Sequence, residues 1–90
     1  HLPMNPLTTD SLTLLFVLVA KPDVMIKPDY ARRVLGTDHQ SQVDAADPLL
    51  DRGWIHRHLQ ANRSMTMGYS LTDAGLLASV TIRDLTNQSL

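Results

Sequence analysis

Two glutamines lie close together in the polar stretch 36–53, and their amides could recognise the edge of a nucleobase. Gln40 and Gln42 can each form a pair of hydrogen bonds with adenine. Their neighbours His39 and Ser41 can donate or accept a hydrogen bond at a base edge or at a phosphate. The same residue types are also ordinary on the solvated face of a helix, so both interpretations stay open for each residue.

The imidazoles of His56 and His58 are the second candidate group, because they stand two residues apart on one face of an expected strand. That spacing is compatible with a shared metal ion. The chain has no Cys and no Glu to complete such a site, so imidazoles at the surface or facing DNA are the favoured interpretation. No nucleophile with a recognisable base and no glycine-rich phosphate loop occurs. We therefore expect no enzyme activity, no metal and no cofactor.

The composition is that of one small domain. The chain has 90 residues, 43% of them hydrophobic, and a formal net charge of −1. A domain of this size buries only about 60–65% of the surface that its unfolded chain exposes, so pairing with a second copy would complete the core. The absence of Cys suits a reducing cytosol. No apolar run reaches the roughly 20 residues needed to cross a bilayer. We expect a cytoplasmic protein without membrane contact.

Helices are expected in the first half of the chain. Residues 12–20 are apolar on all sides and follow a run of good cap residues, which predicts a buried helix. Periodicity alone would also fit a buried strand there. A short strand is expected at 24–26. A second helix is expected at 29–35, because Pro28 suits a first helical position and Gly36 suits a helix end.

The second half predicts a hairpin and a last helix. Gly53 is expected to end the third helix in the left-handed conformation, since only Gly takes positive φ without steric cost. Apolar and polar residues alternate over 54–60 and 65–71, which indicates two half-buried strands. Gly68 inside the second strand suggests a bulge or a close backbone approach. Thr72 is expected to cap the helix that follows.

This order of elements resembles the bacterial winged helix-turn-helix regulators, of the MarR-like and similar small repressor families. The resemblance rests on Leu35-Gly36, on Leu49-Leu50-Asp51-Arg52-Gly53-Trp54-Ile55 and on Leu71-Thr72-Asp73-Ala74-Gly75. It covers roughly residues 24–78. It implies a mainly α fold with a small β-hairpin wing.

The resemblance also implies one winged-helix domain over residues 1–90. An N-terminal extension would occupy 1–7, with Met4 as a candidate natural start. The helical part with the helix-turn-helix would occupy 8–53. The wing hairpin would occupy 54–71, and the C-terminal helix and tail 72–90.

By resemblance, the expected function is that of a DNA-binding transcriptional regulator, a repressor that binds duplex DNA as a homodimer. The third helix and the wing would contact the DNA, and the base-contacting residues would be His39, Gln40, Ser41 and Gln42. The cationic contacts would come from Arg32 and Arg33 on the helix that crosses the backbone, from Arg57 to a phosphate, and from Arg63 at the wing tip to a minor groove.

The first and last helices carry more apolar surface than one side of a small winged helix can cover. We therefore expect a dimer interface that joins the first helix of one copy to the last helix of the other. The expected interface residues are Leu14, Val17, Leu18, Leu76, Val80 and Leu85. The alternative is that these faces pack against another part of a larger protein.

The segment 38–47 carries three carboxylates and no Lys or Arg. Asp38 suits a helix N-cap, but Asp44 and Asp47 would repel phosphates if they faced DNA. This acidity supports an alternative function, a winged-helix protein–protein interaction module whose third helix faces a partner. Pro48 is also unusual, since a Pro inside a helix removes a hydrogen bond. Two short helices, or one helix bent at Asp47, are expected.

Overall fold

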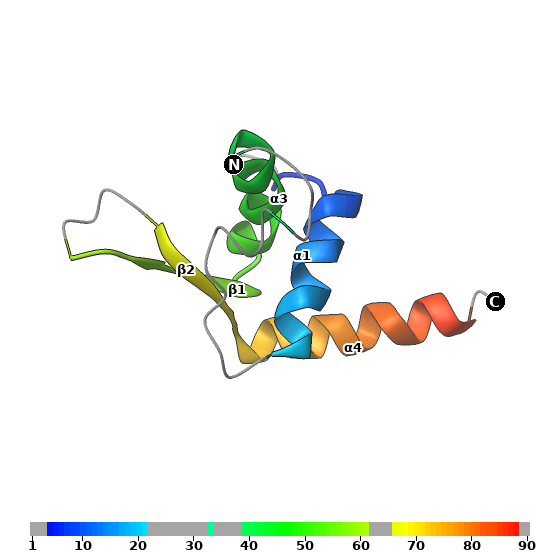
Figure 1. Ribbon diagram of the computed structural model, residues 1–90. Helices are drawn as coiled ribbons and strands as arrows, with labels where there is room; N and C mark the ends of the chain where they lie inside the picture. The colour runs from blue at the N-terminus through cyan, green and yellow to red at the C-terminus, as the bar shows by residue number, and fades with distance from the viewer. Residues whose placement is uncertain (1–3, 22–32, 34–38, 62–65, 89–90) are drawn as a thin grey trace.

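The structure is a computed structural model, which describes residues 4–21, 33, 39–61 and 66–88. The described elements are, in chain order, helices α1 (Thr9–Ala20) and α3 (His39–Asp51), strands β1 (Ile55–Leu59) and β2 (Thr66–Leu71), and helix α4 (Asp73–Gln88). Helices α1 and α3 lie side by side above the start of α4, and the hairpin and the end of α4 project in opposite directions (Figure 1). Within the described part of the chain, no helix is long and apolar enough to cross a membrane.

Helix α1 confirms the helix expected at 12–20. Its N-cap is Thr8, whose side chain accepts a hydrogen bond from the Ser11 backbone N–H at 3.1 Å. Leu14, Leu15 and Leu18 form its inner face and are fully buried. The prediction that Leu14 and Leu18 contact a second copy is therefore wrong, because these side chains fill the core of their own chain.

Helix α3 is a single helix even though it contains Pro48. Of the two expected forms, two short helices are therefore wrong, whereas one helix with a bend at Asp47 stays a prediction. Pro48 lies in the last turn and is fully buried, as is Leu49, which follows it. This burial offsets the one hydrogen bond that a Pro cannot donate. The expected strand at 24–26 and the second helix at 29–35 lie outside the described residues, apart from Arg33.

The two strands form an antiparallel hairpin in which Ile55 pairs with Leu71 and His58 pairs with Gly68. The register then shifts, since Leu59 pairs with Thr66 and leaves Met67 as an extra residue. This confirms the irregularity that Gly68 predicted. Ile55 and Tyr69 fix the inner end of the hairpin in the core, while Leu59 and Met67 further out are exposed.

One core joins all five elements. Three leucines of α1 pack with residues of α3 and of both strands, and partly buried apolar residues surround them. The buried members are Leu14, Leu15, Leu18, Ala46, Leu49, Ile55 and Tyr69. The core thus sets how α3 and the hairpin are oriented relative to each other.

Candidate nucleic-acid interface

A tight corner connects α3 to β1. Gly53 has φ of 71°, the left-handed conformation that the sequence predicted. The Gly53 N–H donates to the Leu50 carbonyl and the Trp54 N–H to the Leu49 carbonyl, each at 3.0 Å. These bonds satisfy carbonyls at the end of α3. The chain therefore leaves α3 and enters the first strand of the hairpin within three residues.

The start of α4 is attached to the same corner through Thr72. Its Oγ1 donates to the Gly53 carbonyl at 2.6 Å and accepts from the Gly75 N–H at 3.0 Å. Its backbone N–H donates to the Trp54 carbonyl at 3.1 Å. Thr72 is thus the predicted N-cap, and the same hydroxyl joins α4 to the end of α3.

The expected base-contacting residues separate into two groups. His39, Gln40 and Ser41 lie in the first turn of α3, and their side chains lie outside the described part of the structure. The Gln42 side chain is 1% exposed. It shares the inner stripe of α3 with Ala46 and Leu49, which lie four and seven residues further along. The prediction that Gln42 contacts a base is therefore wrong for this structure.

Burial of Gln42 has a measurable cost, because within the described part of the chain neither its Nε2 nor its Oε1 has a hydrogen-bond partner. A buried polar group without a partner loses about 1–3 kcal/mol. We expect Gln42→Leu to raise the free energy of unfolding by about that amount. Urea unfolding measures it. The matched control is Gln60→Leu at an exposed position, where a change within about 0.5 kcal/mol is expected. Equal effects of the two substitutions would contradict the assigned burial cost.

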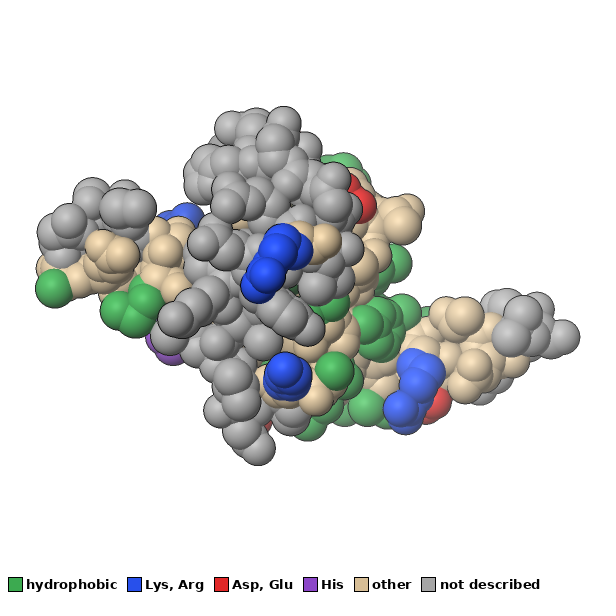
Figure 2. Space-filling view, viewed as in Figure 1, with side chains coloured by type: hydrophobic (Ala, Val, Ile, Leu, Met, Phe, Trp, Pro, Cys, Tyr) green, Lys and Arg blue, Asp and Glu red, His purple; other side chains and the backbone are tan. Residues whose placement is uncertain are grey.

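The four expected arginines are only partly within the described residues. Arg33 and Arg57 are exposed, whereas Arg32 and Arg63 lie outside the described residues. In the space-filling view, basic side chains occupy separate places on this face (Figure 2). The acidic Asp44 is exposed on α3. The described residues that are exposed on α3 and β1 therefore carry charges of both signs.

Arg57 lies on β1 opposite Tyr69 of β2. Burial raises the pKa of Tyr69 above its usual 10.0, and the positive charge of Arg57 partly opposes this rise. A hydrogen bond with the Thr66 side chain also lowers the pKa of Tyr69. The positive charge of Arg57 thus acts on the pKa of the Tyr69 phenol, while the Arg57 residue itself is exposed at the surface.

The two candidate histidines contact each other on the other face of β1. The rings of His56 and His58 meet edge to face, with centroids 4.6 Å apart. His58 Nε2 also shares a hydrogen bond with Ser70 Oγ at 2.7 Å. Among the described residues, no group of three metal-ligating side chains occurs.

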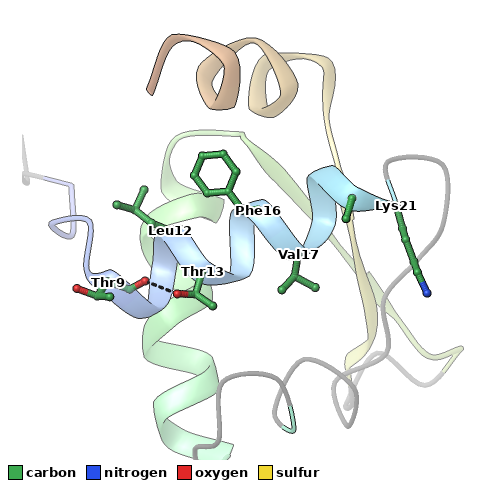
Figure 3. A pocket seen from close by; sticks show the side chains of 7 residues that line it. Thr9, Leu12, Thr13, Phe16, Val17 and Lys21 are labelled. Atoms are coloured by element: carbon green, nitrogen blue, oxygen red, sulfur yellow. Dashed lines mark hydrogen bonds between the residues drawn. The ribbon is translucent and has the colours of Figure 1, made fainter. Parts of the chain in front are cut away.

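The remaining predicted interface residues lie at the surface. Leu76 is 42% exposed and Leu85 59%, while Val17 and Val80 are half-buried. Val17 lines an open groove of about 610 Å³ along α1. Leu12 and Phe16 also line it and point to one side of the helix (Figure 3). Phe16, Leu76 and Leu85 are thus exposed in the single chain.

Comparison with known proteins identifies the fold of the chain. No protein-family model matches the sequence, and no curated protein matches it either. The chain is similar to the solved structure of S. aureus MepR with DNA, at a TM-score of 0.77 and 14% identity over 92% of this chain. It is also similar to S. aureus MepR in a DNA-binding conformation, at a TM-score of 0.70, 17% identity and 92% coverage.

The chain has a winged-helix fold. A further MepR structure, that of a transcription regulator of the Staphylococcus aureus multidrug efflux pump MepA, matches at a TM-score of 0.68 and 20% identity over 92% of this chain. The fold that the resemblance implied is therefore confirmed, with β1 and β2 as the wing of the winged helix. The chain spans 67%, 63% and 62% of the length of these three MepR chains.

Proposed function

We propose that this winged helix is a DNA-binding transcriptional regulator, a cytoplasmic repressor that acts on duplex DNA. The observation that carries the proposal is the similarity, over 92% of the chain, to MepR solved in complex with DNA. MepR is a transcription regulator, so the similarity favours regulation over catalysis. Residues 1–90 would form one such domain.

In this proposal the first turn of α3 enters the major groove. His39, Gln40 and Ser41 lie in that turn, and their polar groups suit base edges. Arg57 on the wing suits a phosphate, and Arg63, which the sequence places at the wing tip, suits a minor groove. Gln42 has no part in this contact, because it is buried.

We also propose that the protein binds DNA as a homodimer. With a net charge of −1, one copy has no overall attraction to phosphates and depends on local contacts from its arginines, which a symmetric pair would double. Apolar side chains of α1 and α4 are available for such a pair. Phe16 is 38% exposed, Leu77 69% and Leu85 59%.

A second candidate function follows from Asp44, which is exposed on α3. A carboxylate on the helix that would face DNA favours a basic protein partner instead. In that case α3 would be the interaction surface of a protein–protein module, and the protein would fail to bind DNA. The experiment below separates the two functions.

We expect Arg57→Ala to weaken binding to the promoter of the protein's own gene by about 3–10-fold. The slope of log affinity against log salt should also fall by about one, since one phosphate contact is lost. Gel shift at several salt concentrations measures both quantities. The control is Arg83→Ala, because Arg83 is exposed on α4 next to Asp84, with their charged groups 4.0 Å apart.

The control variant is expected to bind like the unmodified protein. Equal losses for the two variants would contradict a specific role for the wing. Failure of the unmodified protein to bind any promoter fragment would contradict DNA binding and favour the protein–protein module.

A further inference from the structure

The segment before α1 is held against the far end of α3. Asp51, the last residue of α3, accepts two hydrogen bonds from Asn5 at the same oxygen, Oδ2. The Asn5 backbone N–H donates at 3.2 Å and its Nδ2 at 2.9 Å. Asn5 and Asp51 are 46 positions apart in the sequence and both are exposed. Their contact therefore depends on these hydrogen bonds and not on burial of the two side chains.

Arg52 adds a second connection at the same place. Its Nη1 donates to the Asn5 carbonyl and to the Pro48 carbonyl, each at 2.9 Å. Its guanidinium also lies 5.6 Å from the centre of the Trp54 ring. One side chain thus joins the N-terminal segment, the last turn of α3 and the residue before β1.

The corner between α3 and the wing is therefore held from two sides. On one side, Thr72 at the start of α4 is bonded to Gly53 and Trp54. On the other side, Asn5 is bonded to Asp51 and Arg52. Residues 52–54 are the whole connection between α3 and β1, so this corner acts together with the core in setting the angle between α3 and the wing.

We propose that Asn5 is a positioning residue for the DNA-binding surface, which holds residues 51–54 so that α3 and the wing can engage DNA together. The inference rests on the proposed function. Asn5 itself needs no contact with DNA. Its effect on affinity would come from the geometry of the corner, because misaligned elements cannot make their contacts at once.

The test exchanges the two partners. Asn5→Asp places a carboxylate against that of Asp51, and we expect it to weaken promoter binding by about 5–10-fold. The double variant Asn5→Asp/Asp51→Asn restores a donor opposite an acceptor, since the new amide can donate to the new carboxylate. We expect it to recover most of the affinity.

Trp54 provides a second readout, because it is the single Trp of the chain and lies beside Arg52. We expect Asn5→Asp to shift Trp54 emission in the DNA-free protein, and the double variant to return it. The charge-matched control is Asn87→Asp at an exposed position on α4. It should leave Trp54 emission unchanged.

Two results would overturn the positioning role. One is an Asn5→Asp variant that binds the promoter as well as Asn87→Asp does. The other is a double variant that stays as weak as Asn5→Asp. Absence of DNA binding by the unmodified protein would instead remove the proposed function, and the Trp54 shift would still show whether Asn5 holds the corner.

Discussion

Gly75→Ala is expected to lower the free energy of unfolding by about 3 kcal/mol, at the upper end of the usual cost of overpacking. A Cβ atom at this position would lie 2.0 Å from the Trp54 carbonyl oxygen and 2.8 Å from its carbon. Both are backbone atoms of the corner, so no side chain can rotate away to make room. The gain in helix propensity from Ala, about 1 kcal/mol, is too small to compensate. Urea unfolding measures the loss.

Gly53→Ala is the matched comparison. Gly53 has φ of +71°, and a Cβ there would meet nothing within 4 Å. Gly53→Ala should therefore lower the free energy of unfolding by about 1–2 kcal/mol, through the strained backbone conformation alone. Gly75→Ala should therefore be the more damaging change, although Gly75 lies inside a helix. The opposite order would show that α4 can move away from Trp54 at little cost.

Val17→Asp is expected to dissociate the proposed homodimer. Val17 lines the apolar groove on α1. Full burial of an aliphatic side chain in the dimer interface would stabilise the dimer by about 1.5–3 kcal/mol. A carboxylate buried at the same place would lose hydration in addition. Sedimentation equilibrium at micromolar concentration should give twice 10.0 kDa for the unmodified protein and 10.0 kDa for the variant.

Leu14→Ala tests the core of the single chain separately from the proposed dimer interface. Leu14 is fully buried within its own chain, so its truncation should cost about 2–5 kcal/mol of folding stability. Because Leu14 does not reach the surface, Leu14→Ala should remove no contact between the two copies of the proposed dimer. An unmodified protein that stays folded at 10.0 kDa would rule out the dimer.

Local signals predicted the turns and caps well. Gly53 and Thr72 need only their immediate neighbours to be recognised, because positive φ and N-capping are properties of a few consecutive residues. The irregularity beside Gly68 was visible for the same reason. Helix α1 was also predictable, since its cap residues lie next to its apolar run.

Directions of side chains were harder to predict. Helix α1 is apolar all round, so nothing in its sequence shows that Leu14 and Leu18 face inward while Phe16 faces outward. On α3, Gln42 is buried together with Ala45 and Ala46, and alanines mark a buried face only weakly. A polar residue at such a position is expected at the surface. The contact of Asn5 with Asp51 joins distant residues, and no local pattern indicates it.

The extra residue Met67 divides the hairpin into an inner part and an outer part with different pairing registers. Inside the bulge, Ile55 and Tyr69 are held in the core, so that part of the hairpin cannot change its register. Outside the bulge, the alternation of β2 has already shifted by one residue. Removal of Met67 would move Thr66 to the other face of the hairpin and leave the inner pairing intact. A single-residue deletion could thus change which face Thr66 occupies while Ile55 and Tyr69 keep their places in the core.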